Sequence, residues 1–145
     1  MAAMNTPRPE KDEVALELPL TGWCVTQCCV DHAFTIKLWG QQGEFSIRIE
    51  ADFGFVPSRG AEIVHIRPGI IRELAPALEV FGSSIDRAVV YKDGKMCIDF
   101  SNGMSISAEP DEEYEAWNVS GPRGFLVVAL PGGGIATWRS EGDEQ

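Results

Sequence analysis

The chain has 145 residues, of which 44% are hydrophobic, and 12 Lys and Arg against 22 Asp and Glu give a formal charge of −10. This length and composition predict one domain with a sizeable core and argue against a disordered chain. The negative charge argues against nucleic acid or an anionic membrane surface as a partner; it suits a basic protein partner, or simply solubility.

The two ends of the chain lack hydrophobic periodicity. Residues 1–13 are rich in Pro and charge, so we expect a disordered tail there without the apolar core of a signal peptide. Residues 140–145 are predicted to be a frayed acidic tail, which leaves residues 14–139 as a single β-rich domain. No apolar run is long enough to cross a bilayer, and the expected location is the cytoplasm.

The first half of the domain is predicted to be an antiparallel meander. Residues 14–18 suit an edge strand that ends at Pro19, and Gly22 opens a second strand that runs to Val30. Strict alternation of apolar and polar residues over 34–38 and 45–50 then indicates two half-buried strands. The four cysteines, Cys24, Cys28, Cys29 and Cys97, lack the paired spacing of a zinc site. We therefore expect free thiols, no metal and no cofactor.

One helix is predicted, around residues 69–81. The apolar residues of this stretch recur at helical spacing and form one stripe; they are Ile70, Ile71, Leu74, Ala77, Leu78 and Phe81. Pro76 removes a backbone hydrogen bond, so the helix is expected to be kinked. The predicted fold class is mainly β (α+β), with antiparallel β-meanders and this helix packed on them.

The clearest pattern is a three-stranded meander over residues 89–106. Asp93-Gly94 predicts a two-residue type I′ turn, which would place Val89 opposite Ile98. For the second turn, a three-residue loop ending at Gly103 keeps the apolar residues on one face, whereas a two-residue loop mixes the faces. We therefore predict the three-residue loop there.

The two halves of the domain are similar in sequence. Residues 34–38 align with 96–100, residues 45–52 with 104–111, and Gly22 and Val25 match Gly82 and Ile85. This predicts two related halves, a pseudo-repeat of 20–55 and 80–120. Alternation shared by any two meanders is the other explanation.

Residues 114–119 alternate as a further strand. This pattern places Tyr114 on one face and Glu115 with Trp117 on the other. Trp117 is predicted to anchor the core, with a binding role as the alternative, and Glu115 is expected to position the indole or to pair with Arg123 across the next turn. Glu112, Glu113 and Glu115 beside Tyr114 are consistent with a solvated turn as well as with acid–base chemistry.

The second half of the chain resembles an uncharacterised bacterial family. The resemblance rests on Asp93-Gly94, Phe100, Gly103, the Tyr-Glu-Ala-Trp run at 114–117, and the Pro-Gly-Gly-Gly run at 131–134. The family pattern is D-G-x-L-x-x-x-F-x-x-G followed by Y-E-A-W. The resemblance implies a small β-rich protein without an established activity, similar to immunity-type proteins of bacterial toxin systems.

Three functional hypotheses follow. The first is a non-catalytic cytoplasmic binding protein, an immunity-like inhibitor of a basic protein partner. The second is a small-ligand binder or hydrolase-type enzyme that uses a Tyr/Glu/Asp cluster of Tyr114, Glu115 and Asp99. The third is a structural homodimer joined through a sheet edge. The candidate binding residues are Asp99, Tyr114, Glu115, Trp117 and Arg123, and no catalytic residue is assigned.

Overall fold

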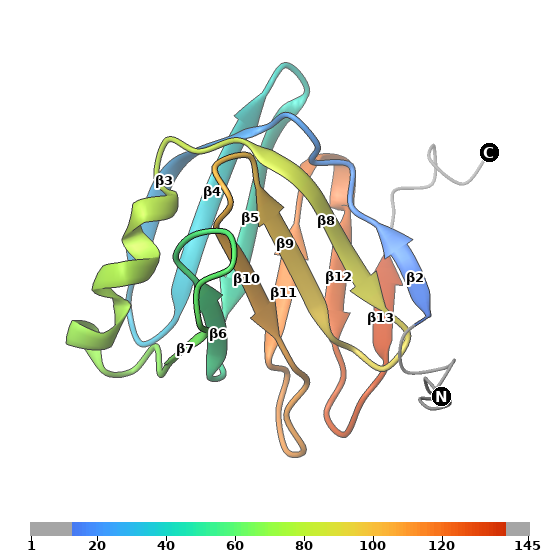
Figure 1. Cartoon of the computed structure of the whole chain (residues 1–145). Helices are drawn as coiled ribbons and strands as arrows, with labels where there is room; N and C mark the ends of the chain where they lie inside the picture. The colour runs from blue at the N-terminus through green and yellow to red at the C-terminus, as the bar shows by residue number, and fades with distance from the viewer. Residues whose placement is uncertain (1–12, 139–145) are drawn as a thin grey trace, which may run out of the picture.

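The structure is a computed structural model that describes residues 13–138 as two antiparallel sheets of six strands each, packed in two layers (Figure 1). The front sheet has the order β2 (Val14–Glu17), β8 (Ile85–Tyr91), β9 (Met96–Phe100), β10 (Ser105–Ala108), β6 (Phe53–Val56) and β7 (Val64–Ile66). The back sheet has the order β13 (Ile135–Trp138), β12 (Leu126–Ala129), β11 (Trp117–Ser120), β5 (Gly43–Ile49), β4 (Phe34–Gly40) and β3 (Cys24–Val30). The predicted mainly β fold of antiparallel meanders is confirmed.

The alternating residues of the strands form the core between the sheets. Phe34, Ile36 and Leu38 of β4 have no exposed surface, and they belong to one cluster of buried hydrophobic residues with Ile98 and Phe100 of the opposite sheet. Burial of each such side chain contributes about 1.5–3 kcal/mol. The period-two pattern in the sequence therefore predicted the inner face of these strands correctly.

The two turns of the central meander have the same form. The Tyr91 amide bonds to the Lys95 carbonyl over 2.8 Å, and the Phe100 amide bonds to the Met104 carbonyl over 2.9 Å. Each pair encloses three residues, and the last of them is a glycine at positive φ, +101° in the first loop and +95° in the second. The predicted three-residue loop ending at Gly103 is confirmed.

The predicted type I′ turn at Asp93 is wrong. Asp93 does not have a positive φ, and Val89 lies opposite Cys97 instead of Ile98. Residues 88–90 are all buried and apolar, so both registers satisfy the inner face and alternation does not choose between them. The Asp93 carboxylate accepts a hydrogen bond from the Lys95 amide over 3.0 Å, which stabilises the longer loop.

The predicted helix forms, as the 3-10 helix η1 (Ile71–Val80), but with a different buried face. Its buried residues are Leu74, Ala77 and Val80, spaced by three as a 3-10 helix requires. Ile71 and Phe81, expected on the buried stripe, are 73% and 62% exposed. Pro76 lies within the helix and has no amide to donate to either an α-helical or a 3-10 ladder.

The two meanders meet through matched backbone hydrogen bonds. The Gly22 amide donates to the Ile85 carbonyl over 2.7 Å, and the Gly82 amide donates to the Val25 carbonyl over 2.9 Å. Gly22 and Gly82 also share their conformation, with φ of +86° and +85°. Gly22 aligns with Gly82 and Val25 with Ile85, so the two hydrogen bonds join equivalent residues of the two halves.

Each half also lends a strand to the sheet of the other half. After β5, the chain crosses to β6, which pairs with β10, and after β10 it crosses to β11, which pairs with β5. Phe53 of β6 lies opposite Ala108, and Trp117 of β11 lies opposite Ile49, at corresponding positions. The halves differ beside their first meander strands, β8 and β3. Strand β2 pairs with β8 in one sheet, whereas η1 lies next to β3 in the other (Figure 1). A duplicated unit would give this arrangement, and the duplication itself stays a prediction.

The predicted tails lie outside the described residues, except for Glu13. Its carbonyl accepts a hydrogen bond from the Lys92 amide over 2.9 Å, which continues the pairing of β2 by one residue. Within residues 13–138, no helix has the length and apolar character needed to cross a membrane.

Candidate functional site

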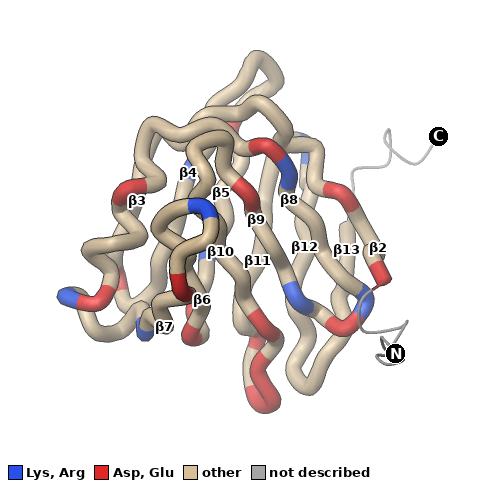
Figure 2. Tube along the Cα trace, viewed as in Figure 1, with Lys and Arg blue, Asp and Glu red and all other residues tan. Residues whose placement is uncertain are grey.

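The loop between β10 and β11 concentrates negative charge at one end of the sandwich. Figure 2 shows this loop in red, projecting beyond the strands. Glu50 and Asp52, in the turn between β5 and β6, are exposed next to it. We use the name acidic end for Tyr114 and the carboxylates of Glu50, Asp52, Glu109, Asp111, Glu112, Glu113 and Glu115.

Two neighbouring loops and Trp117 form the base of the acidic end. The Trp117 indole nitrogen donates to the Gly94 carbonyl over 2.9 Å, and the Gly134 amide donates to the Asp93 carbonyl over 2.9 Å. A Cβ atom on Gly94 would lie 2.9 Å from the Gly134 carbonyl oxygen, so a larger residue does not fit without a shift. The Asp-Gly, Tyr-Glu-Ala-Trp and Pro-Gly-Gly-Gly motifs of the sequence therefore meet in space.

The acidic loop is itself fixed along its length. The Asp111 carbonyl accepts a hydrogen bond from the Gly132 amide over 2.8 Å, and the Ala116 carbonyl accepts from the amides of Glu50 and the next residue over 2.8 and 3.2 Å. Inside the loop, the Asp111 carboxylate accepts from the Glu113 amide over 2.8 Å. These bonds hold the loop in one conformation before any partner binds.

Tyr114 lies among these carboxylates with 45% of its surface exposed. Partial burial, and then the negative charges of Asp111, Asp52 and Glu50, raise the pKa of its phenol. The hydroxyl therefore keeps its proton at neutral pH and can donate a hydrogen bond. Its ring adds apolar contact area to a surface that is otherwise charged.

A depression of about 510 Å³ adjoins Tyr114 on the outer face of the front sheet. It contains Lys95, whose ammonium lies 3.8 Å from the Glu109 carboxylate, together with Ser107 and His65. Ser107 and His65 flank strand β6 on either side, so two strand spacings, about 10 Å, separate their backbones. The Ile63 side chain occupies the space over Gly54, between the serine and the histidine, and no hydrogen bond joins these two side chains.

Asp99 is not part of the acidic end. It lines a separate depression of about 290 Å³ on the same sheet, beside Arg87. Lys95, the residue just before β9, borders the depression of Tyr114. Asp99 lies four positions further along the same strand. The expected cluster of Tyr114, Glu115 and Asp99 is thus not assembled, because strand β9 carries Asp99 away from the acidic end.

The predicted strand faces of residues 114–117 are wrong, because β11 begins only at Trp117. Tyr114 and Glu115 belong to the acidic loop and are exposed. Trp117 has no exposed surface, so its predicted place in the core is confirmed. A fully buried indole cannot contact a partner directly, and Trp117 instead holds the loop of Gly94.

Arg123 lies in the short 3-10 turn η2 (Pro122–Gly124), which follows β11. Glu115 precedes this strand, and β11 spans about 13 Å at the usual rise per residue. The expected pair of Glu115 and Arg123 is therefore placed at opposite ends of one strand. Arg123 lines a third hollow, beside Phe45 and Phe125.

The cysteines and the acidic groups do not form a metal site within the described residues. Among the described residues, no group of three His, Cys, Asp or Glu side chains is placed to hold a metal ion. Burial, and then the neighbouring Cys29, raise the pKa of Cys28 to about 11. This thiol therefore stays protonated at neutral pH, as a small hydrophobic residue does.

Sequence reasoning missed the residues that organise the acidic end. Glu50 and Asp52 approach Tyr114 from the other half of the chain, and the pairing of β5 with β11 and of β6 with β10 brings them there. Asp93 and Gly94 were interpreted as a hairpin turn alone. The signal available was the occurrence of three glycine-containing or aromatic motifs in the second half of the chain, at residues 93–94, 114–117 and 131–134.

The model of DUF6188, a family of unknown function, matches residues 16–139. No curated protein and no solved structure matches the chain significantly.

Proposed function

We propose that the chain, which belongs to the DUF6188 family of unknown function, is a non-catalytic binding protein that presents its acidic end to a basic protein partner. The finer form of this proposal is an immunity-like inhibitor in the bacterial cytoplasm. The observation that carries it is the acidic loop, whose exposed carboxylates surround Tyr114 and whose backbone is bonded to two other segments, the β12–β13 loop and the β5–β6 turn.

The charge of the acidic end suits recognition of a basic surface. Carboxylates on a projecting loop attract a cationic partner during diffusion and raise the association rate, an effect that added salt weakens. Lys95 and His65 are the basic groups in the adjoining depression, and Glu109 partly offsets Lys95. Asp52 and Asp111 line the depression as well, so its acidic side chains outnumber its basic ones.

Tyr114 supplies the apolar contact that charge alone does not provide. Interface hot spots are enriched in Tyr and lie where surrounding contacts exclude water. A tyrosine on a loop that is bonded on both sides of it, here at Asp111 and Ala116, loses less conformational freedom on binding. Tyr114 is therefore expected to be the anchor, with the surrounding carboxylates setting orientation and rate.

The experiment measures binding to basic proteins encoded beside the gene, by calorimetry and stopped-flow kinetics. A Glu112→Lys/Glu113→Lys variant is compared with a Glu79→Lys/Asp86→Lys variant, which makes the same change in net charge at exposed sites elsewhere. The first is expected to weaken binding by about a hundredfold, through lost and reversed charge contacts, and the second to change it by less than about threefold.

Tyr114→Ala tests the anchor, with Tyr114→Phe as the matched control. The alanine variant should lose about 2 kcal/mol of binding free energy or more. The phenylalanine variant keeps the ring and should lose only a small part of that amount.

Equal losses of affinity in the two charge-reversal variants would mean that net charge, and not the acidic end, drives association.

The homodimer hypothesis has a different site, the edge strands of the two sheets: β2 and β7 in one sheet, and β13 and β3 in the other, where η1 lies beside β3. A dimer joined through an edge would continue one sheet into the other subunit. Sedimentation at several protein concentrations tests it, because a monomer at every concentration would leave no role for an edge contact.

A further inference from the structure

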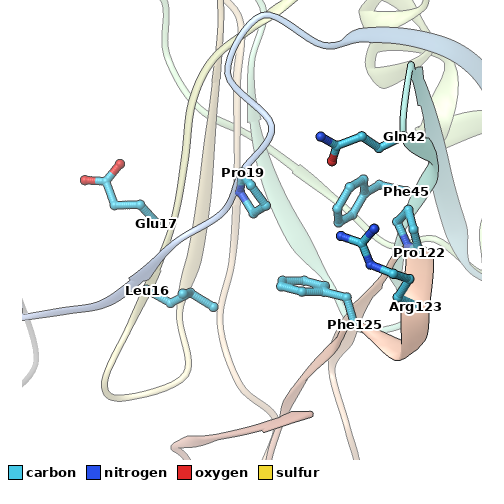
Figure 3. A pocket seen from close by; sticks show the side chains of 8 residues that line it. All are labelled: Leu16, Glu17, Pro19, Gln42, Phe45, Pro122, Arg123 and Phe125. Atoms are coloured by element: carbon cyan, nitrogen blue, oxygen red, sulfur yellow. The ribbon is translucent and has the colours of Figure 1, made fainter. Parts of the chain in front are cut away.

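A cleft opens between the β2 side of the front sheet and the η2 turn of the back sheet, away from the acidic end. Its volume is about 370 Å³, within the range of small-molecule sites. Figure 3 shows Leu16 and Pro19 on one side, facing Phe45, Phe125 and Pro122 on the other. Gln42, Arg123 and Glu17 supply the polar groups of the lining.

The aromatic wall of this cleft is rigid. The Phe45 ring packs edge-on against Trp23, with centroids 5.0 Å apart, and against Phe125, with centroids 5.4 Å apart. The backbone of Gly121 lies so close to Phe45 that a Cβ atom there would be 2.3 Å from the ring. The wall is thus in place before any ligand enters, which lowers the entropic cost of binding.

Arg123 is held at the cleft in an unusual backbone conformation. Its φ and ψ are 58° and 38°, the left-handed region that glycine or asparagine occupies more easily. Residues held in such conformations cluster at ligand sites, and the inference runs from the observed strain to a use for the side chain. Figure 3 shows the guanidinium directed into the space between Phe45 and Phe125.

The charges around the cleft favour an anionic ligand group. The Glu17 carboxylate is engaged by Arg87, with oxygen and nitrogen 2.7 Å apart, and Figure 3 shows Glu17 pointing away from the other lining side chains. Arg123 makes an interaction of its own within the chain, which a ligand would join or replace. Its planar fork of donors matches a carboxylate, and Gln42 adds a neutral amide.

We propose that this cleft binds a small carboxylic acid with an aromatic or branched apolar body. The body lies between Phe45, Phe125 and the two prolines, and the carboxylate lies at Arg123. This site is separate from the acidic end and does not depend on the function proposed for that end.

The test uses three probes with one body and different head groups: 3-phenylpropanoate, 3-phenylpropanamide and 3-phenylpropylammonium. Each is titrated into the full chain while backbone amide shifts are followed by NMR. The carboxylate should bind at least about tenfold more tightly than the amide, since a charged hydrogen bond replaces a neutral one, and the ammonium most weakly. Saturable shifts should centre on Gln42, Phe45 and Phe125.

Arg123→Gly should remove the preference for the carboxylate over the amide, and glycine accepts the same backbone conformation, so this variant should fold. Arg59→Gly, at the corresponding loop of the other half, should leave all three affinities unchanged. Equal binding of the three probes, shifts that do not saturate at millimolar probe, or an equal loss in both variants would each overturn the proposal.

The Glu112→Lys/Glu113→Lys variant separates this site from the acidic end. It should bind 3-phenylpropanoate as the unmodified chain does, while Arg123→Gly should bind the basic protein partner unchanged. Loss of probe binding in the charge-reversal variant would contradict the independence of the cleft.

Discussion

The turn between β4 and β5 lies against the β11–β12 loop in the same way that the loop between β9 and β10 lies against the β6–β7 loop. A Cβ atom on Gly43 would be 2.9 Å from Pro122, and one on Gly103 would be 3.0 Å from the Arg59 amide. Each corner therefore has a glycine turn pressed onto a loop that carries an arginine. The strand exchange between the halves produces both contacts.

The side chains that fill the two corners differ. The first corner has Phe45, Phe125 and two prolines around Arg123, whereas the second has Met104 and the charged groups Asp86, Arg87 and Asp99 around Arg59. The first can bury an apolar ligand body, and the second is suited only to hydrated polar groups. Backbone pairing thus decides where loops meet, and the loop side chains decide what chemistry is offered there.

The largest expected effect compares the equivalent aromatic residues of the two sheets. Trp117→Ala and Phe53→Ala should each lower the free energy of unfolding by roughly 3–5 kcal/mol, because both side chains are buried in the common core. Urea denaturation measures the change. Trp117→Phe retains most of the ring and loses the bond to Gly94, so it should cost about 1–3 kcal/mol.

A Trp117→Ala protein with unchanged melting behaviour would contradict the core position of this residue. If Phe53→Ala cost much less than Trp117→Ala, the two halves would be unequal in packing despite their matched registers.

The glycines give the next largest effect. Gly94→Ala should destabilise by about 2 kcal/mol or more, because it combines a positive φ with a clash against Gly134. Gly22→Ala and Gly82→Ala meet no atom within 4 Å and should each cost about 1 kcal/mol from backbone strain alone. Thermal denaturation of the three variants separates the effect of backbone strain from that of the clash. Unequal destabilisation by Gly22→Ala and Gly82→Ala would contradict the equivalence of the two halves.

The two loop arginines should respond to glycine in opposite directions. Arg123→Gly relieves a left-handed residue and is expected to leave stability unchanged or raise it by up to about 1 kcal/mol. Arg59 has no positive φ, so Arg59→Gly should lower stability by about 0.5–1 kcal/mol through the entropy of the unfolded chain. Chemical denaturation compares them, and destabilisation by Arg123→Gly of the same size would argue against strain at this position.

The smallest effect concerns the edge of β3, where η1 lies in the position that β2 has beside β8 in the other sheet. The side chain and the backbone amide of Arg67 lower the pKa of Glu73 from 4.5 to about 2. Because the folded pKa is below the unfolded one, the stabilisation is complete above pH 4.5 and is lost as pH falls toward 2. NMR titration of the carboxyl group should show this, and Glu73→Gln should remove the corresponding pH dependence. Titration of Glu73 near 4.5 would contradict the pairing.

The candidate site was predicted only in part. Tyr114 and its neighbouring glutamates were identified from composition, and they do lie together on one exposed loop. Asp99 was expected to join a Tyr/Glu/Asp cluster with them and Arg123 to pair with Glu115 across the next turn, but β9 and β11 carry Asp99 and Arg123 to other hollows. Closeness in sequence predicted correctly which side chains share one loop, but it did not predict which loops lie next to each other.

The amino-acid sequence by itself determined the features that depend on near neighbours. Alternation identified the inner faces of β4, β5, β9 and β10, and polarity separated the two candidate registers at Ser101-Asn102-Gly103. Where several consecutive residues are apolar, as at Ala88-Val89-Val90, local pattern was insufficient and the turn was wrong. The tertiary structure decided the winding of η1, whose buried residues recur every third position and not at the α-helical spacing that was expected.

Only the tertiary structure decided how the loops are assembled. The bond from Trp117 to Gly94 and the approach of Asp52 to Tyr114 join residues that no local periodicity connects. They result from the exchange of β6 and β11 between the two sheets, which is stable because it buries both inner faces in one core. A strand's face is set by alternation along the chain, whereas its partner is set by the burial that the whole fold achieves.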